Sequence, residues 1–339
     1  MDLGIDLSSV RNIGYTVAMH DFFIDRIVRL RGISPDDLLS SMKGKIEAGG
    51  GSIRGIEQVE MKGGNAVNLA YALAMLDARC KLITVADDYG RMMLRHTFTG
   101  LSNVDLILLN GKQGYTVSLE FVYGRVANVM LSDVGDNAYF GADRLEGLEY
   151  ILSNASCVAV VNWASNMKGT ELAEKAFNTS SRALHFIDTA DLGGRGKEFV
   201  DAILEGRFRL DVLSMNENEA RIVANTLELE PLPYNYSIDD VARLCRGIAS
   251  TLAIRVDLHT PICSATSDGK DHEEVRAFKV DSKIATGAGD VWNAADILGY
   301  LCKMDDHTRL FFANASAAYY VENAIAPTLD DVLRLVGKE

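Results

Sequence analysis

One segment combines small residues, a carboxylate and the start of an apolar helix. Gly287, Ala288 and Gly289 are followed by Asp290 and then by the apolar run that begins at Val291. Backbone N–H groups in the first turn of a helix have no partner within the helix, so small residues there leave room for an anion. Asp290 either caps this helix or faces the bound anion and accepts a proton from an attacking hydroxyl. The segment alone does not choose between these roles.

A second segment places two glycines directly before a predicted helix. Gly63 and Gly64 precede the apolar-periodic run over residues 65–76, and Asn68 falls in its first turn. Glycines let the backbone approach a ligand closely, and an Asn amide both donates to and accepts from sugar hydroxyls. A role in forming the turn explains this segment equally well.

A third segment opens a helix after a short apolar strand. Asn216 and Glu219 stand three residues apart, directly after the predicted strand over residues 212–215. This spacing brings both side chains to one side of the helix start, where they can form a capping box. The same pair can hold a hydrated Mg²⁺ beside a phosphate. Both interpretations stay open at this point.

Together, the three segments resemble the PfkB family of carbohydrate and nucleoside kinases. That family carries Gly-Gly-x-x-x-Asn, Asn-x-x-Glu and Gly-Ala-Gly-Asp segments in this order, and the resemblance extends over nearly the whole chain. It implies phosphoryl transfer from a nucleotide to a hydroxyl, with Asp290 as the general base. The amides of Gly287, Ala288 and Gly289 would form an anion hole, which suits the negative charge on a transferring phosphoryl group.

The resemblance also implies an acceptor site. Gly63, Gly64 and Asn68 would bind the hydroxyls of a sugar, a nucleoside or a related polyol. The first strand should end near an acidic substrate ligand, for which Asp21 is the nearest candidate. An acceptor that already carries a phosphate is a further alternative.

On the donor side, the resemblance implies Mg²⁺ and ATP or ADP as the phosphoryl donor. Asn216 and Glu219 would organise the metal and the phosphates, and Asn314 would contact the nucleotide. This side departs from the family pattern, because Ile284–Ala285 replaces an Asp-Thr pair and residues 257–259 lead into a segment without the usual Gly-x-x-Gly loop. A non-catalytic sugar- or nucleotide-binding sensor on the same fold therefore stays open as a second hypothesis.

Strand-like and helix-like segments alternate over most of the chain, which is typical of parallel βαβ units. Strands are predicted at residues 12–19, 80–85, 104–109, 157–162, 184–188, 212–215 and 252–256, and helices at 65–76, 287–301, 307–323 and 330–336. The pattern predicts an α/β fold with three α/β/α layers and a mostly parallel central sheet. With the resemblance, we expect a single ribokinase-like domain over residues 1–339.

Residues 114–137 interrupt this alternation with a predicted β-hairpin, whose strands flank Gly124–Arg125. An antiparallel hairpin does not fit inside a parallel sheet, so it should belong to a separate one. We expect a small β-sheet lid formed by segments within about 14–62 and 114–137. Its exposed edge strands predict a homodimer in which two copies pair.

Ligands of open parallel sheets bind beyond the carboxyl ends of the strands, so Asn162, Trp163 and Asp188 are further cleft candidates. His20, beside Asp21, is a weaker one. The motifs GxxxxGK[ST], HExxH and GxSxG are missing from the sequence, which argues against a P-loop enzyme, a zinc hydrolase and a serine esterase.

The 339 residues include 34 Lys plus Arg and 47 Asp plus Glu, a net charge of −13. Such a field repels phosphate backbones and anionic membranes, so neither nucleic acid nor a membrane is an expected partner. The five cysteines form no CxxC pair and are read as reduced thiols. The chain shows no signal-peptide pattern or membrane-length apolar run, and we expect a cytoplasmic protein.

Overall fold

The computed structural model describes residues 10, 12–123, 125–284 and 286–337. Gly124 and Ala285, named above, lie outside the described residues. The strands are β1 (Thr16–His20), β2 (Phe23–Arg31), β3 (Glu57–Gly63), β4 (Cys80–Ala86), β5 (Val104–Asn110), β6 (Gly114–Tyr123), β7 (Arg125–Asp133), β8 (Cys157–Val161), β9 (Leu184–Asp188), β10 (Val212–Asn216), β11 (Arg255–His259), β12 (Cys263–Ser267) and β13 (His272–Arg276). The α-helices are α2 (Pro35–Glu47), α3 (Asn65–Met75), α4 (Asp88–Thr97), α5 (Glu149–Ser153), α6 (Gly169–Thr179), α7 (Gly196–Leu204), α8 (Glu217–Thr226), α9 (Ile238–Leu252), α10 (Ala288–Leu301), α11 (Asp306–Asn323) and α12 (Leu329–Val336).

The described residues form a nine-stranded sheet in the order β13-β12-β11-β10-β9-β8-β1-β4-β5. Its strands are parallel except β12, which runs antiparallel to both β11 and β13. Central strands such as β8, Cys157-Val-Ala-Val-Val161, are buried along their whole length. Continuous apolar character of this kind reflects helices on both faces of a parallel sheet.

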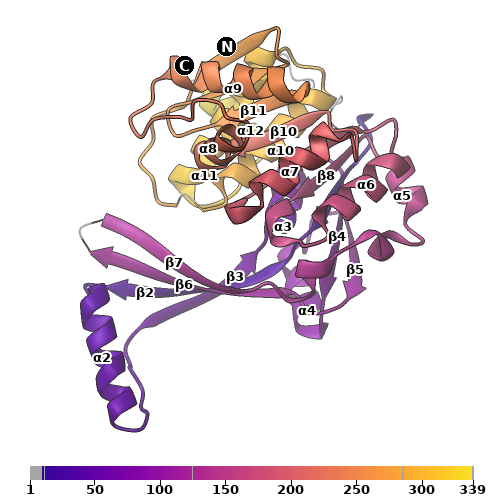
Figure 1. Cartoon of the computed structure of the whole chain (residues 1–339). Helices are drawn as coiled ribbons and strands as arrows, with labels where there is room; N and C mark the ends of the chain where they lie inside the picture. The colour runs from indigo at the N-terminus through magenta and orange to yellow at the C-terminus, as the bar shows by residue number, and fades with distance from the viewer. Residues whose placement is uncertain (1–9, 11, 124, 285, 338–339) are drawn as a thin grey trace.

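Helices cover both faces of this sheet (Figure 1). Side chains of α3, α10, α11 and α12 pack into one buried apolar cluster, and side chains of α6, α7, α8 and α9 pack into another. The two clusters lie on opposite sides of the strands, because alternate residues of a strand point to opposite faces. The expected three-layer α/β/α architecture is confirmed.

A second sheet, hereafter the small sheet, has the order β3-β2-β6-β7. The predicted hairpin is confirmed as β6 and β7, and β2 joins it in parallel, with Phe23 opposite Gly114. Figure 1 shows the small sheet extending away from the body of the molecule, with α2 at its far end. None of the residues of α2 is buried. Segments far apart in sequence thus build one projecting unit.

The predicted and observed boundaries differ most at β11. The sequence predicts a strand over residues 252–256, but Leu252 ends α9 and the strand runs from Arg255 to His259. Ala253 adopts a left-handed conformation, φ 54°, that terminates the helix without a glycine to signal it. The first strand likewise begins at Thr16 rather than at residue 12.

The five cysteines are free thiols, as expected, and four of them are buried. In the described part of the chain, no helix has both the length and the apolar character that a membrane crossing requires.

Candidate active site

A cavity of about 620 Å³, hereafter the cleft, opens where strands β1, β8, β9, β10 and β11 end. Residues of the small sheet close its other side, including Phe23, Thr116 and Met130. Ligands of open α/β sheets bind at this edge. Carboxylates dominate its polar lining, and no Lys or Arg stands among its described lining residues: the acids are Asp21, Asp25, Asp188, Asp191, Glu219 and Asp290.

Asp290 is the third residue of α10 and lines the cleft. It does not cap the helix, because the N-cap residue is Gly287, which has no side chain to do so. The Asp290 carboxylate instead accepts a hydrogen bond from Nδ2 of Asn68, at 2.9 Å. Burial raises the pKa of the Asp290 carboxyl well above its ordinary value; Asp188 raises it further, whereas the bond from Asn68 lowers it. A carboxylate in this state suits a general base.

The turn before α10 depends on Gly287. Its φ is +87°, and a Cβ atom there would lie 2.8 Å from Oη of Tyr320. That hydroxyl donates to the carbonyl of Thr286, at 2.9 Å. Gly287 and Gly289 line the cleft, so the free amides at the start of this 14-residue helix lie at the cavity wall.

Gly64 brings α3 against the end of β1. Its φ is +94°, and a Cβ atom there would lie 2.9 Å from both the carbonyl oxygen of Asp21 and Cα of Phe22. The next turn of α3 presents Asn68 to Asp290. The second predicted segment therefore meets the first at the cleft, although 222 residues separate the two bonded side chains.

Asp21 lines the cleft, but its carboxylate is engaged by the protein. It accepts from the backbone amides of Asn65 and Ala66, at 2.9 and 2.8 Å, and from Nδ2 of Asn162, at 2.8 Å. The helix start supplies unpaired amides, and a carboxylate there is stabilising. In this structure Asp21 anchors the start of α3 at the edge of the cleft.

Asp25 is a cleft residue that the sequence did not single out. It lies on β2, opposite Thr116 of β6, and both residues line the cleft. Its carboxylate passes directly over Gly63, where a Cβ atom would lie 2.1 Å from Oδ2. Burial raises the pKa of Asp25 to about 6, partly offset by a hydrogen bond from Thr116. A lone acid in the apolar run Phe23-Ile24-Asp25 is the signal that marks it.

Asn216 and Glu219 form the capping box that their spacing predicted. Oδ1 of Asn216 accepts from the backbone amide of Glu219 at 3.1 Å, and the Glu219 carboxylate accepts from the backbone amide of Asn216 at 2.9 Å. Both residues also line the cleft. Burial raises the pKa of Glu219 well above its ordinary value, and the nearby Asp188 raises it further.

These acids bear on whether the site suits Mg²⁺. In the described residues, no group of three or more His, Cys, Asp or Glu side chains is arranged to enclose a metal. Mg²⁺ commonly keeps several waters and binds one or two carboxylates together with phosphates. Asp188 and Glu219 are buried acids, and the negative charge of Asp188 disfavours the ionised form of Glu219. A nearby divalent cation would stabilise the ionised forms of both. The donor set fits a hydrated Mg²⁺ rather than a closed metal cage.

Gly63 and Ala288 adjoin residues that line the cleft but are not themselves among its described lining residues, and three further predicted candidates are buried and do not line it. Asn314 is buried, where its side chain accepts from Nε1 of Trp292 at 2.9 Å and donates to the carbonyl of Val275 at 3.2 Å. Trp163 is fully buried in the core, and so is His20. None of the three stands among the described residues that line the cleft. The nucleotide-binding role of Asn314 stays a prediction.

Two aromatic side chains meet where β11 ends, and His259 of this pair lines the cleft. His259, at the end of β11, packs its ring 4.9 Å from that of Trp292 and lies against Gly289. Burial lowers the pKa of His259 to about 4, so the ring is neutral at neutral pH. His259 belongs to the segment in which the usual Gly-x-x-Gly loop of the family pattern is missing.

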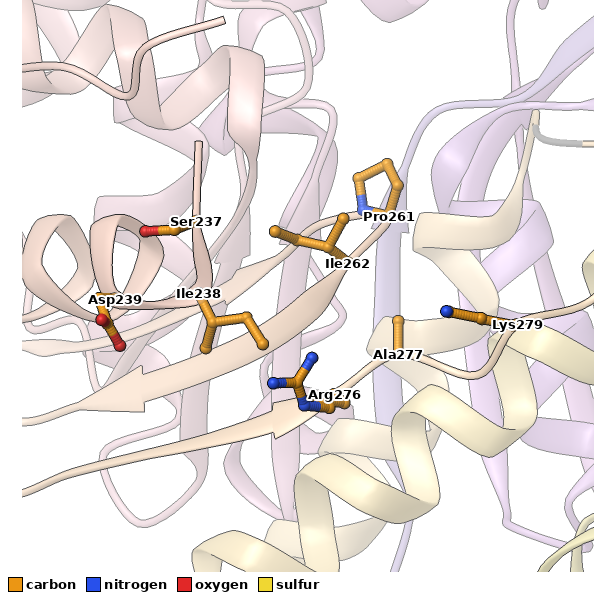
Figure 2. Close-up of a pocket in the computed structure, with 8 residues that line it drawn as sticks. All are labelled: Ser237, Ile238, Asp239, Pro261, Ile262, Arg276, Ala277 and Lys279. Carbon is orange, nitrogen blue, oxygen red and sulfur yellow. The ribbon is translucent and has the colours of Figure 1, made fainter. Parts of the chain in front are cut away.

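A second cavity, of about 510 Å³, begins just beyond His259. It lies between the start of α9, the turn from β11 to β12, and the segment after β13 (Figure 2). Its lining is partly apolar and includes two cations: Ser237, Ile238, Asp239, Pro261, Ile262, Arg276, Ala277 and Lys279.

One protein family and several solved structures are similar to this chain. The family model of the pfkB family carbohydrate kinases matches residues 39–327, and the chain belongs to this family. No curated protein sequence matches the chain.

Solved structures show the same fold. The ribokinase of Thermotoga maritima has a TM-score of 0.73 at 19% identity, over 95% of this chain and 98% of that one. The ribokinase of Arabidopsis thaliana, complexed with ribose and ATP, has a TM-score of 0.69 at 17% identity, over 95% and 97%. The adenosine kinase of Sinorhizobium meliloti has a TM-score of 0.71 at 16% identity, over 95% and 98%. The fold is therefore ribokinase-like.

Proposed function

We propose that this protein transfers the terminal phosphoryl group of a nucleotide to a hydroxyl of a sugar, nucleoside or related polyol. One observation carries the proposal: a buried carboxylate, Asp290, stands beside the glycine turn of α10 and is held by Asn68 of the neighbouring helix α3, within a cleft of about 620 Å³. This arrangement pairs a base with an anion-binding turn. Family membership supports the same chemistry.

In the proposed reaction, the acceptor hydroxyl oxygen attacks the terminal phosphorus. The bond from that phosphorus to the bridging oxygen breaks, and its electron pair leaves with the shortened nucleotide. The hydroxyl proton passes to the Asp290 carboxylate. Amides of the Gly287–Gly289 turn hold the phosphoryl oxygens, which is where such reactions need stabilisation.

The two halves of the cleft divide the substrates between them. Asp25, Asn68 and Asp290 lie on the acceptor half and offer hydroxyls both donors and acceptors. Asn216 and Glu219 lie on the donor half. There Mg²⁺, when bound, would neutralise phosphate charge, and Glu219 and Asp188 would hold its hydration shell.

The nucleotide, ATP or ADP, extends from the glycine turn past His259 toward the second cavity. Ile238 and Ile262 offer apolar contact for a base, and Arg276 and Lys279 offer positive charge (Figure 2). Accordingly, Ile262→Trp should raise the KM for the nucleotide and leave the KM for the acceptor unchanged.

The small sheet acts as a lid in this proposal, because it supplies one wall of the cleft. Its edge strands, β3 and β7, and exposed side chains such as Val129 and Leu131 favour pairing of two copies. A mass measurement by solution scattering tests this homodimer; a monomeric mass would reject it.

A non-catalytic sensor is the second candidate. His259 favours it, because its ring, packed on buried Trp292, lines the cleft on the proposed donor side, near where the family pattern has glycines. A sensor would bind the same small molecules without transferring phosphate.

The decisive experiment measures phosphoryl transfer from ATP and from ADP, with Mg²⁺, across nucleosides, pentoses, hexoses, polyols and sugar phosphates. Three proteins are compared: the wild type, Asp290→Ala, and Asp330→Ala as a control at an exposed position of α12. Transfer to one acceptor that is lost in Asp290→Ala and kept in Asp330→Ala supports the kinase. No transfer, with ligand-dependent shifts in melting temperature, supports the sensor.

A further inference from the structure

Lys62 lies behind the acceptor wall of the cleft rather than in it. It stands on β3 directly opposite Ile24 of β2, and directly opposed residues of an antiparallel pair share a face of the sheet. Ile24 is buried against the core, so Lys62 points toward α3. There its Nζ lies 5.0 Å from the centre of the Tyr71 ring. Lys62 is not among the described residues that line the cleft.

A chain of two hydrogen bonds leads from Lys62 to the proposed base. Nζ of Lys62 donates to Oδ1 of Asn68, and Nδ2 of Asn68 donates to Oδ2 of Asp290 at 2.9 Å. An ammonium group can only donate, so it forces the amide to present its oxygen to Lys62. The NH₂ group must then face Asp290. Without the ammonium, the amide is free to turn its oxygen toward the carboxylate, which repels it.

The charges around Asp290 explain why a link to Lys62 should affect its ionisation. The charged or titratable groups that act on it are Asp188 at the end of β9, Asp21 after β1, Tyr320 of α11 and Lys62 of β3, and His259 of β11 lies against the adjacent Gly289. Asp188 and Asp21 disfavour the ionised form of Asp290, and His259 is neutral. Among these described groups, Lys62 is the cation, and its charge favours the ionised form of Asp290. Lys62 also interacts electrostatically with Asp25.

We propose that Lys62 is a positioning residue that acts through Asn68: its ammonium fixes the amide, so that the NH₂ group holds one oxygen of Asp290 and the other oxygen is left for the acceptor hydroxyl. This assignment of a role to Asp290 rests on the proposed kinase function. The link itself crosses three elements, because Lys62 belongs to the small sheet, Asn68 to α3 and Asp290 to α10. The base is therefore prepared only when the small sheet stands in its observed position.

The test follows the titration of Asp290 in the full-length, unliganded protein by NMR of ¹³C-carboxyl-labelled aspartate. The Asp290 signal is identified by its loss in Asp290→Asn. In Lys62→Met, Asp290 should titrate at least about one pH unit higher than in the wild type, a tenfold change in its proton-dissociation constant. Lys62→Arg keeps the charge and should titrate within about half a unit of the wild type.

Lys62→Gln separates charge from hydrogen bonding, because its amide still donates but carries no charge. It should titrate above Lys62→Arg. If Lys62→Met fails to fold by circular dichroism, this Gln and Arg pair still decides the question. Equal titration of Asp290 in the charged and uncharged variants would overturn the proposal, and so would a titration in Lys62→Gln as high as in Lys62→Met, because Lys62 would then act by its charge alone and not through Asn68.

A kinetic arm uses whichever acceptor the panel identifies. The acid limb of the kcat/KM profile should move to higher pH in Lys62→Met, with kcat reduced and the acceptor KM little changed, because Lys62 does not touch the acceptor. A silent panel would reject the proposed kinase function without affecting the titration result. Conversely, an unchanged titration with active transfer would reject only the role of Lys62.

Discussion

Helix α10 carries two buried aspartates, Asp290 and Asp296, whose surroundings differ. The Asp296 carboxylate and the Arg309 guanidinium that bonds it are both fully buried. Asp290 is 6% exposed, accepts from the neutral amide of Asn68 and faces the cleft. Burial raises the pKa of both carboxyls, against the lowering effect of Arg309 on Asp296.

The comparison shows that the partner, rather than the burial, decides what a carboxylate can do. Arg309 also bonds Asp257 at 3.1 Å and Asp306 at 3.0 Å, so it closes a network that ties α10 and α11 to β11. A permanent charge with five fixed donors commits such a network to structure. Arg309 bonds only one oxygen of Asp296, but that carboxylate lies in the interior, whereas Asp290 bonds a neutral amide and lines the cleft, where a ligand can reach it.

The largest expected effect is on phosphoryl transfer, when each of the two aspartates is replaced by asparagine in a separate variant. Asp290→Asn should lower phosphoryl transfer by about 10³-fold or more, because the amide cannot accept the hydroxyl proton. Its melting temperature should not fall, because a buried acid with a raised pKa is removed. Asp296→Asn should keep transfer near the wild-type rate. Equal loss of transfer in both variants would contradict the division of roles.

Arg309→Met should produce the largest loss of stability. It leaves Asp257 and Asp296 buried without their cation, which costs about 3–5 kcal/mol in the free energy of unfolding. Arg243→Met is the matched control: Arg243 is exposed and pairs with Glu230 and Asp240, so its loss should cost at most about 1 kcal/mol. Urea unfolding of both variants measures the difference, and similar costs would show that the network is dispensable.

Asp25→Asn should change the pH dependence of stability. Asp25 has a pKa of about 6 in the folded protein, above its ordinary value, so between about pH 4 and 6 the folded state retains a proton that the unfolded state has released. This contribution makes stability fall as pH rises, by about 1–2 kcal/mol after allowance for the partial exposure of Asp25. The variant should lose less stability than the wild type over this range in urea titrations. If the stabilities of the variant and the wild type changed equally with pH, the raised pKa would not belong to Asp25.

The smallest effect is expected for the stability of Asp296→Asn. Its neighbour Asp257 disfavours a second negative charge, and burial raises the pKa of Asp296 well above its ordinary value. Exchange for a neutral amide of the same shape should therefore alter the free energy of unfolding by less than about 1 kcal/mol. A loss as large as that of Arg309→Met would show that the Asp296 charge is needed.

Much of the fold was predictable because its signals are local. The apolar run over residues 157–161 and the periodic helix from Asn65 appear in the structure nearly as predicted. Strand β11 was misplaced because Ala253 ends α9 in a left-handed conformation that favours glycine, and no glycine stands there.

The site was predictable where a motif marks it or where a central strand ends, as at Asn162 and Asp188. The turn over residues 287–290 and Asn68 meet at the cleft, as their shared family pattern implies. Asp25 and Lys62 carry no such mark, because β2 pairs with β6 and β3 across long stretches of chain, and only that pairing turns one residue to the cleft and the other to α3. Asn314 shows the reverse: a motif residue whose amide is committed to Trp292.

Helix α2 offers a practical consequence of its position at the end of the small sheet. Its residues are unburied, so a fluorescent dye attached at an engineered cysteine there, for example Ser40→Cys, disturbs no packed surface. The four buried thiols would resist labelling, whereas Cys302, half-buried, calls for replacement first. With a second dye on α12, the distance between the two fluorophores becomes an optical readout of any movement of the small sheet relative to the main sheet, one molecule at a time.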